Sequence, residues 1–273
     1  MHLAPSRSIN GSFGGIIAIG NLKGGVGKST LSVALAGAMA RNGKSVALVD
    51  GDPQGTSRRW LERCDLPVHV ETLDVESLSS LECWLGRAER LVQAHGTVIV
   101  DLPAVIGPTM ASAFLLARLI VVPVSLSAVD IDGTNRVLRY IRAARSERGG
   151  VGPEVLIVPN KLPRSVGVER PILASLLGFG ETVVAGLSLY PEHGRAFAAG
   201  RWIGDHVPGS RAHNEVMELE AVVAEAMRRT TPAPRIEAAR QTRRERERRA
   251  MVAAAQPLTP DKARPWWQRF FAS

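Results

Sequence analysis

The stretch NLKGGVGKST, residues 21–30, lies between an apolar run at residues 16–19 and a run rich in Ala and Leu at residues 31–40. The order of strand, glycine loop and helix is the context that a phosphate-binding loop needs. Three glycines let the backbone bend so that successive N–H groups converge on phosphate oxygens, and the following helix adds its own unpaired N–H groups. The stretch therefore predicts a site for the phosphates of a nucleotide.

Two side chains of this loop have clear chemical roles. Lys28 can supply a positive charge to the β- and γ-phosphates, and Ser29 can supply a hydroxyl to Mg²⁺. The general pattern G-x-x-x-x-G-K-[ST] requires Gly where this chain has Leu22, and a second lysine, Lys23, follows it. The residues predicted to contact the nucleotide here are Lys23, Gly24, Gly25, Val26, Gly27, Lys28, Ser29 and Thr30.

Apolar runs without polar alternation occur at residues 45–49, 97–101, 119–124 and 155–158. Such runs are typical of strands buried on both faces of a parallel sheet. Helical patterns between them predict right-handed β-α-β units, so we expect an α/β fold with a doubly wound, mostly parallel sheet of the P-loop NTPase type. Weaker strands are expected at residues 68–71 and 182–187, and helices at residues 56–63, 80–94, 109–117, 131–147, 169–177 and 212–229.

Four polar residues stand where predicted strands end: Asp50, Asp52, Asp101 and Asn160. In such a sheet the ligand lies at the carboxyl ends of the strands, so one crevice can gather all four with the phosphate loop. A lone Asp can equally cap a turn or a helix. Beside a phosphate loop, Asp101 fits a Walker B aspartate that holds Mg²⁺ through a water molecule.

The net charge of +8 is unevenly distributed. Residues 228–273 contain 12 Lys and Arg against 4 Asp and Glu, which gives +8, while residues 1–227 contain 22 of each sign. A charge block of this kind predicts a polyanionic partner. Because Glu245 and Glu247 stand among the arginines, a solvated helix is the alternative.

Composition divides the chain into three parts: a disordered N-terminus at residues 1–14, a globular domain with the phosphate loop at residues 15–229, and a basic helical or flexible tail at residues 230–273 that ends in an aromatic segment. No apolar run approaches the roughly 20 residues of a membrane-spanning helix, and the first residues lack a signal-peptide pattern. We therefore expect a cytoplasmic protein whose two cysteines, Cys64 and Cys83, are reduced.

The K-G-G-x-G-K-[ST] form of the loop resembles the deviant Walker A motif of the ParA/MinD family of ATPases. The segment VDGDPQG, residues 49–55, looks like the D-x-D-P-Q-G segment of ParA proteins, and residues 98–103 look like their Walker B strand. The sequence DLPA at residues 101–104 departs from the commoner D-T-P-P of that family. The resemblance covers most of residues 15–227 and favours the ParA branch.

The resemblance implies a composite site with three catalytic residues, Lys23, Lys28 and Asp52. Lys23 would reach across a nucleotide-sandwich dimer to the partner's phosphates, and Asp52 would orient the attacking water. Hydrolysis would be slow alone, because no arginine finger or strong general base is evident in the sequence. The ATP-bound protein would be a homodimer and the ADP-bound protein a monomer.

The resemblance also implies the contacts of the metal and the base. Ser29 and Asp101 (through water) would manage Mg²⁺, and Asp50 would couple the metal to a switch region. Asn160 would contact the base, and Pro208 would pack near it.

The sequence NKLP at residues 160–163 starts like the N-K-x-D motif of GTPases. The Asp of that motif accepts two hydrogen bonds from guanine, and Pro163 cannot do so. ATP, with Mg²⁺, is therefore the expected nucleotide.

A ParA-type partition or positioning ATPase would bind nonspecific DNA as an ATP dimer and release it when a ParB-like partner stimulates hydrolysis. Such a protein would associate with the nucleoid when ATP is bound, and its phosphate contacts would make DNA binding depend steeply on salt. The arginines predicted to contact DNA are Arg195, Arg201, Arg211, Arg228, Arg229, Arg243 and Arg244.

Two other classes of protein remain open. In a MinD-like membrane-cycling ATPase, the aromatic face at residues 266–271 would insert into a bilayer interface. A metabolic enzyme of the same fold, such as a dethiobiotin synthetase, would leave the basic tail unexplained. A nitrogenase iron protein needs cluster-binding cysteines, and neither Cys64 nor Cys83 follows a strand end or a switch motif.

Overall fold

The computed structural model describes residues 14–73, 78–125, 127–150, 152–163 and 170–230. The expectations for the N-terminus before Gly14 and for the tail after Thr230, including Arg243, Arg244 and the aromatic segment, lie outside the described residues. Among the helices of the described ranges, none combines the length and apolar character needed to cross a membrane.

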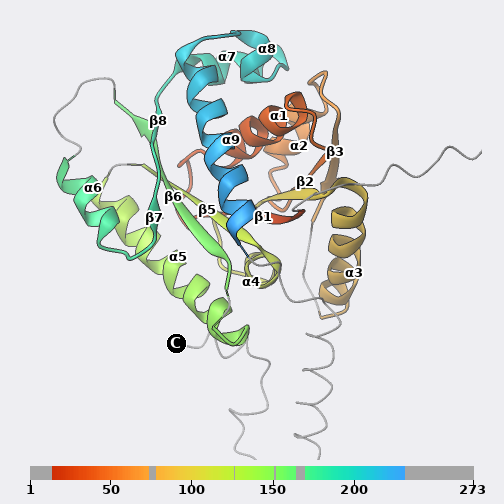
Figure 1. Cartoon of the computed structure of the whole chain (residues 1–273), viewed down its shortest axis with the longest axis vertical. Helices are drawn as coiled ribbons and strands as arrows, with labels where there is room; N and C mark the ends of the chain where they lie inside the picture. The colour runs from red at the N-terminus through yellow and green to blue at the C-terminus, as the bar shows by residue number, and fades with distance from the viewer. Residues whose placement is uncertain (1–13, 74–77, 126, 151, 164–169, 231–273) are drawn as a thin grey trace, which may run out of the picture.

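The predicted parallel sheet is confirmed (Figure 1). Its strands follow the order β3-β2-β4-β1-β5-β6-β7, with β8 beside β6, and every strand pair of the described residues is parallel. Because β1 lies between β4 and β5, the winding of the chain reverses at β1, and a ligand crevice is expected at its carboxyl end. The strands are β1 (Gly15–Ile19), β2 (Val46–Asp50), β3 (Val68–Thr72), β4 (Thr97–Asp101), β5 (Leu119–Ser125), β6 (Glu154–Leu162), β7 (Thr182–Val183) and β8 (Leu187–Ser188).

The sheet separates two apolar cores. Along β1, Ile17 and Ile19 point into one core, and Ile16 and Ala18 point into the other, as the two-residue period of a strand requires. The first core is covered by α1, α2, α7, α8 and α9, with α9 in front of the sheet in Figure 1, and the second by α3, α4, α5 and α6. The helices are α1 (Lys28–Arg41), α2 (Thr56–Leu61), α3 (Leu78–His95), α4 (Pro108–Leu116), α5 (Ala128–Glu147), α6 (Arg170–Leu177), α7 (Pro191–Ala199), α8 (Ile203–His206) and α9 (Arg211–Arg229).

Two sequence-based expectations were wrong in detail. The single strand expected at residues 182–187 is two short strands, β7 and β8, which both pair with β6. Between them Gly186 packs against Pro159, whose ring nitrogen cannot donate to a ladder, so the pairing is interrupted there. Helices α7 and α8 were not expected, because α8 has four residues and α7 buries only Ala196, which leaves no apolar period to detect.

Candidate nucleotide-binding site

The carboxyl ends of the central strands bring the predicted site residues together. Asp101 at the end of β4 is in register with Asp50 at the end of β2 and with Ile19 at the end of β1. On the other side of β1, Asn160 of β6 is in register with Ser125, the last residue of β5. The loop at residues 20–27 leaves β1 in the middle of this edge and leads into α1.

The loop needs glycine at particular positions. Gly25 and Gly27 have φ angles of 77° and 92°, in the left-handed region that favours glycine. A Cβ on Gly27 would lie 2.4 Å from Nδ2 of Asn160, so a side chain there would also collide with β6. At Gly24 a Cβ would meet nothing within 4 Å, which leaves this part of the loop open to a ligand.

Lys28, the first residue of α1, is buried, with 7% of its surface exposed. Its Nζ donates to the carbonyl oxygen of Lys23 at 3.2 Å. Burial lowers the pKa of Lys28, and the nearby carboxylates of Asp101 and Asp52 oppose that change. A buried ammonium at the start of a helix that begins after a glycine loop is placed to meet anionic phosphate.

Asp101 is fully buried and is held by α1, because Ser32 Oγ donates to its Oδ1 at 3.0 Å. Its other oxygen, Oδ2, has no hydrogen-bond partner among the described residues. Burial raises the pKa of Asp101 to about 6, although the hydroxyls of Ser29 and Ser57 lower it. Ser32 was not expected from the sequence, since no motif marks the fifth residue of this helix.

This carboxylate and the hydroxyl of Ser29 fit Mg²⁺, which prefers oxygen ligands and keeps several waters. Among the described residues no group of three His, Cys, Asp or Glu side chains could hold a metal by itself. A magnesium ion bound with substrate phosphates needs only one or two such ligands. When bound, the ion would neutralise charge that develops on the phosphates.

Asp50 and Asp52 shape the loop that follows β2. Asp50 is buried, and its two oxygens accept the backbone N–H of Asp52 at 3.0 Å and of Arg58 at 2.9 Å. Asp52 Oδ1 accepts the N–H of Gln54 at 2.9 Å. Asp50 therefore fastens the start of α2 to the strand end, as a coupling residue would.

The predicted base contacts differ in position. Asn160 is buried and spans the gap to the phosphate loop, with its Nδ2 donating to the Val26 carbonyl at 2.7 Å. Pro208 lies exposed in the turn between α8 and α9. Contact of either residue with a base stays a prediction.

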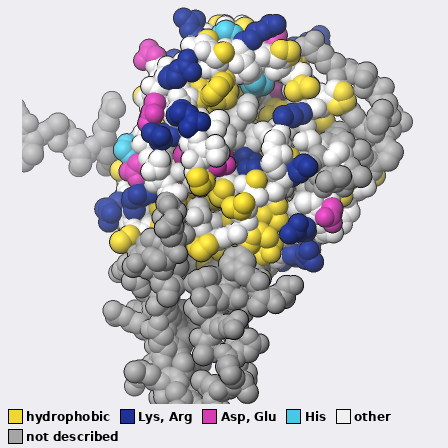
Figure 2. All heavy atoms as spheres, turned by 180° about the vertical axis from the view of Figure 1, so that it is seen from behind, with side chains coloured by type: hydrophobic (Ala, Val, Ile, Leu, Met, Phe, Trp, Pro, Cys, Tyr) yellow, Lys and Arg dark blue, Asp and Glu magenta, His cyan; other side chains and the backbone are white. Residues whose placement is uncertain are grey.

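The predicted DNA-contacting arginines fall into two separate groups. Arg195, Arg201 and Arg211 lie exposed on α7, before α8 and at the start of α9. Arg228 and Arg229 lie at the far end of α9, about 26 Å away at 1.5 Å per helical residue. Figure 2 shows that Lys and Arg on the rear face are likewise scattered rather than gathered in one patch.

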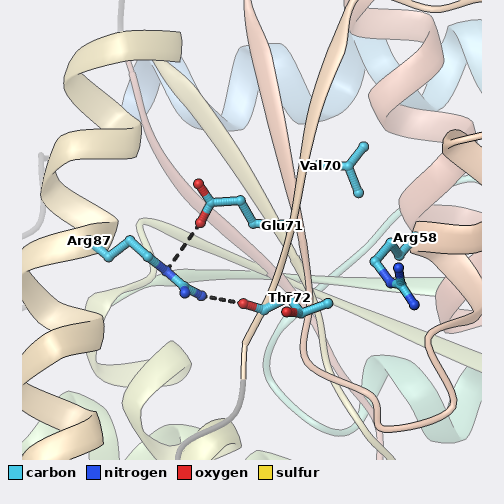
Figure 3. A pocket seen from close by; sticks show the side chains of 5 residues that line it. All are labelled: Arg58, Val70, Glu71, Thr72 and Arg87. Carbon is cyan, nitrogen blue, oxygen red and sulfur yellow. Dashed lines mark hydrogen bonds and ion pairs between the residues drawn. The ribbon is translucent and has the colours of Figure 1, made fainter.

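A hollow of about 480 Å³ lies beside the edge strand β3 (Figure 3). Strands β2 and β4 separate β3 from β1, which leads into the phosphate loop. Arg87 reaches into the hollow from α3, where it pairs with Glu71 at 3.2 Å and donates to the Thr72 carbonyl. On the other side of the strand Arg58 pairs with Glu62. Both guanidinium groups therefore have carboxylate partners, and the hollow lies at the outer edge of the sheet rather than at the phosphate loop.

Comparison with known proteins matches residues 17–184 to the protein-family model of the CobQ/CobB/MinD/ParA nucleotide binding domain. The chain belongs to this family. It is 33% identical to the sporulation initiation inhibitor protein Soj of Bacillus subtilis over 165 residues, which are 47% of this chain and 65% of that protein. It is 28% identical to the chromosome-partitioning ATPase Soj of Thermus thermophilus over 237 residues, which are 74% of this chain and 93% of that protein. These relatives place it in the ParA-type branch.

Solved structures share the fold. An ATP complex of a Cyanothece McdA variant has a TM-score of 0.62 at 15% identity and covers 80% of this chain and 97% of its own. A cobyrinic acid a,c-diamide synthase from Mycobacterium smegmatis, with a bound ATP analogue and magnesium, has a TM-score of 0.63 at 16% identity and covers 80% and 98%.

Proposed function

We propose that this chain is an ATP-dependent, dimerising switch ATPase that binds nonspecific DNA and positions or partitions DNA or other cargo. The observation that carries the proposal is the different burial of the two lysines of the phosphate loop. Lys28 is buried beside the strand-end carboxylates, whereas Lys23 is exposed. Since Lys28 already serves the phosphates of its own site, the exposed charge of Lys23 is free to serve those of a second copy.

In the proposed site, the loop backbone and Lys28 bind the ATP phosphates, and Ser29 and Asp101 hold Mg²⁺. Asp52 orients the attacking water. Its position supports that role, because its carboxylate acts electrostatically on Lys28. Slow hydrolysis follows from the need for a partner to complete the site, and a ParB-like protein is the proposed stimulator.

The cargo side of the proposal rests on relatives and on charge. The relatives include proteins named for chromosome partitioning and for the maintenance of carboxysome distribution. Exposed Arg195, Arg201 and Arg211 lie close together in sequence near one end of α9 and offer contacts for DNA phosphates. An ATP-bound dimer would double this surface, which gives nucleotide-dependent association with the nucleoid.

The test is binding of random-sequence duplex DNA at low salt by the full chain with ATP, with ADP, and with ATP after Lys23→Ala. We expect the protein to bind DNA with ATP but not with ADP, and we expect Lys23→Ala to lose this binding. Arg90→Ala, on the exposed face of α3, should behave as the parent protein. For Asp52→Ala we expect ATP binding to persist and hydrolysis to stop. ATP-loaded protein that ignores DNA but floats with anionic liposomes would replace this proposal with membrane cycling.

A further inference from the structure

Lys161 has an unusual backbone conformation. Its φ angle of 59° is the only positive value at a non-glycine residue in the described ranges. It stands in β6 at a register irregularity, where Asn160 pairs with Leu187 and Leu162 pairs with Ser188. A bulge of this kind redirects the side chain of the extra residue, and the left-handed region is a strained conformation for a lysine.

The redirected side chain reaches the phosphate loop. Lys161 Nζ donates to the carbonyl oxygen of Gly25 at 2.6 Å, and its backbone N–H donates to Asn160 Oδ1 at 2.9 Å. The amide of Asn160 in turn donates to the carbonyl of Val26. Two consecutive residues of β6 thus hold two consecutive carbonyls of the loop.

Holding these carbonyls also sets the direction of the loop N–H groups. In a planar trans peptide the C=O and the following N–H point in opposite directions. With the Gly25 carbonyl turned toward Lys161, the N–H of Val26 points to the opposite side. By the same geometry, the contact of Asn160 with Val26 directs the N–H of Gly27 away from β6.

We propose that Lys161 is a positioning residue of the nucleotide site, which fixes the Gly25–Val26 peptide so that the Val26 N–H faces the bound phosphates. The inference rests on the proposed function of the loop and adds a residue to it. Lys161 acts through the backbone and contacts no reacting atom. Its strained conformation is retained because the bulge is what delivers the ammonium to Gly25.

The experiment compares the full chain carrying Lys161→Met, Lys161→Asn or Lys161→Arg. Met keeps the length of the side chain and loses its charge, whereas Asn tolerates positive φ and also loses the charge. Arg keeps a cationic donor. Arg90→Met, on the exposed face of α3, removes one positive charge elsewhere as the matched control.

We expect Lys161→Met and Lys161→Asn to weaken both ATP and ADP binding by about tenfold, since each loses a hydrogen bond from a charged group. The KM for ATP should rise by a similar factor while kcat at saturating ATP stays unchanged, and Lys161→Arg should restore most of the affinity. In the nucleotide-free protein, amide exchange of the loop peptide should quicken in the Met and Asn variants.

A purely structural bulge would give another pattern, in which Asn binds nucleotide normally and only Met loses thermal stability. That pattern, or unchanged loop exchange in both variants, would overturn the inference while leaving the proposed function intact. Failure of the parent protein to bind ATP or ADP would instead overturn the proposed function and this inference together.

Discussion

The two ends of the sheet both bury charge, and they use it differently. At the carboxyl end, Lys28 donates to one backbone carbonyl, and Oδ2 of Asp101 has no hydrogen-bond partner within the part of the chain that the structure describes. At the amino end, Arg118 donates to the carbonyls of Gly14 and Thr230, and Arg148 donates to that of Ala117 at 2.7 Å. Burial lowers the pKa of both guanidinium groups.

The difference lies in what the charges are bonded to. Arg118 joins the residue before β1 to the end of α9, so its hydrogen bonds fasten two distant parts of the chain. Thr230 adds a bond from its hydroxyl to Glu154 at 3.1 Å. At the carboxyl end, Lys28 donates only to a carbonyl of its own loop, and Asp101 accepts from side-chain hydroxyls such as that of Ser32. A buried charge held in this way destabilises the protein until a ligand supplies a charged or metal partner. Buried charge therefore stabilises the fold at one end and prepares a binding site at the other.

The largest expected effect comes from Lys28→Met, which keeps the aliphatic part of the side chain and removes the ammonium. ATP affinity should fall by a hundredfold or more, on the order of 3 kcal/mol for a lost charge-assisted contact to phosphate. The melting temperature without nucleotide should change little, because the cost of burying the ammonium is offset by its attraction to the Asp101 and Asp52 carboxylates. Calorimetric titration with ATP measures the affinity, and thermal unfolding measures the melting temperature. Unchanged ATP affinity would contradict the claim that the buried charge of Lys28 serves ligand binding.

Arg118→Met makes the same kind of change at the amino end. It leaves the carbonyls of Gly14 and Thr230 without this donor, so the free energy of unfolding should fall by about 2–3 kcal/mol. ATP affinity of the folded protein should stay within about twofold. Urea unfolding and ATP titration of the same sample check both statements, and a large loss of affinity at full stability would contradict them.

Asp101→Asn tests whether the carboxylate is costly when no ligand is bound. Because the folded-state pKa of about 6 exceeds the usual value of 3.8, the unfolded chain ionises first as pH rises. The contribution of Asp101 to stability is thus present below about pH 4 and is lost as pH rises to about 6. The Asn variant cannot ionise, so near neutral pH it should be more stable than the parent by about 3 kcal/mol.

Urea unfolding of the two proteins without nucleotide, at a series of pH values, measures this difference. The curves should converge in acid and separate toward neutral pH. Equal stability of the parent and the Asn variant at every pH would show that the ionised Asp101 carboxylate is not destabilising in the ligand-free protein.

The smallest effect is expected at the surface of the amino end. Arg228 pairs with Glu225 on the exposed side of α9, with about half of each side chain accessible to solvent. Arg228→Gln should change the free energy of unfolding by less than about 0.5 kcal/mol, because water and salt screen exposed pairs. If Arg228→Gln lowered the free energy of unfolding as much as Arg118→Met, position at the amino end of the sheet, rather than burial, would determine how much a charge stabilises the fold.

Local sequence was enough to predict the central sheet and the edge of it at which the polar strand-end residues lie. The buried strands are continuous apolar runs, and the glycine loop, Asp50 and Asp101 lie at their carboxyl ends. A parallel sheet places these ends at one edge, so the residues come together without any further signal in the sequence. The contacts of Ser32 and Lys161 could not be predicted in this way. Ser32 faces Asp101 from 69 residues away, and Lys161 reaches Gly25 through a bulge that no local pattern encodes.

The most direct test of the central claim, that a second copy completes the carboxyl-end site, is the molar mass of the Asp52→Ala protein in solution. Light scattering during size-exclusion chromatography should give the mass of two chains with saturating ATP and Mg²⁺, and of one chain with ADP. Adding Lys23→Ala to the same protein should return the ATP sample to the mass of one chain. A single-chain mass with ATP bound, confirmed by nucleotide content of the eluted peak, would contradict the account.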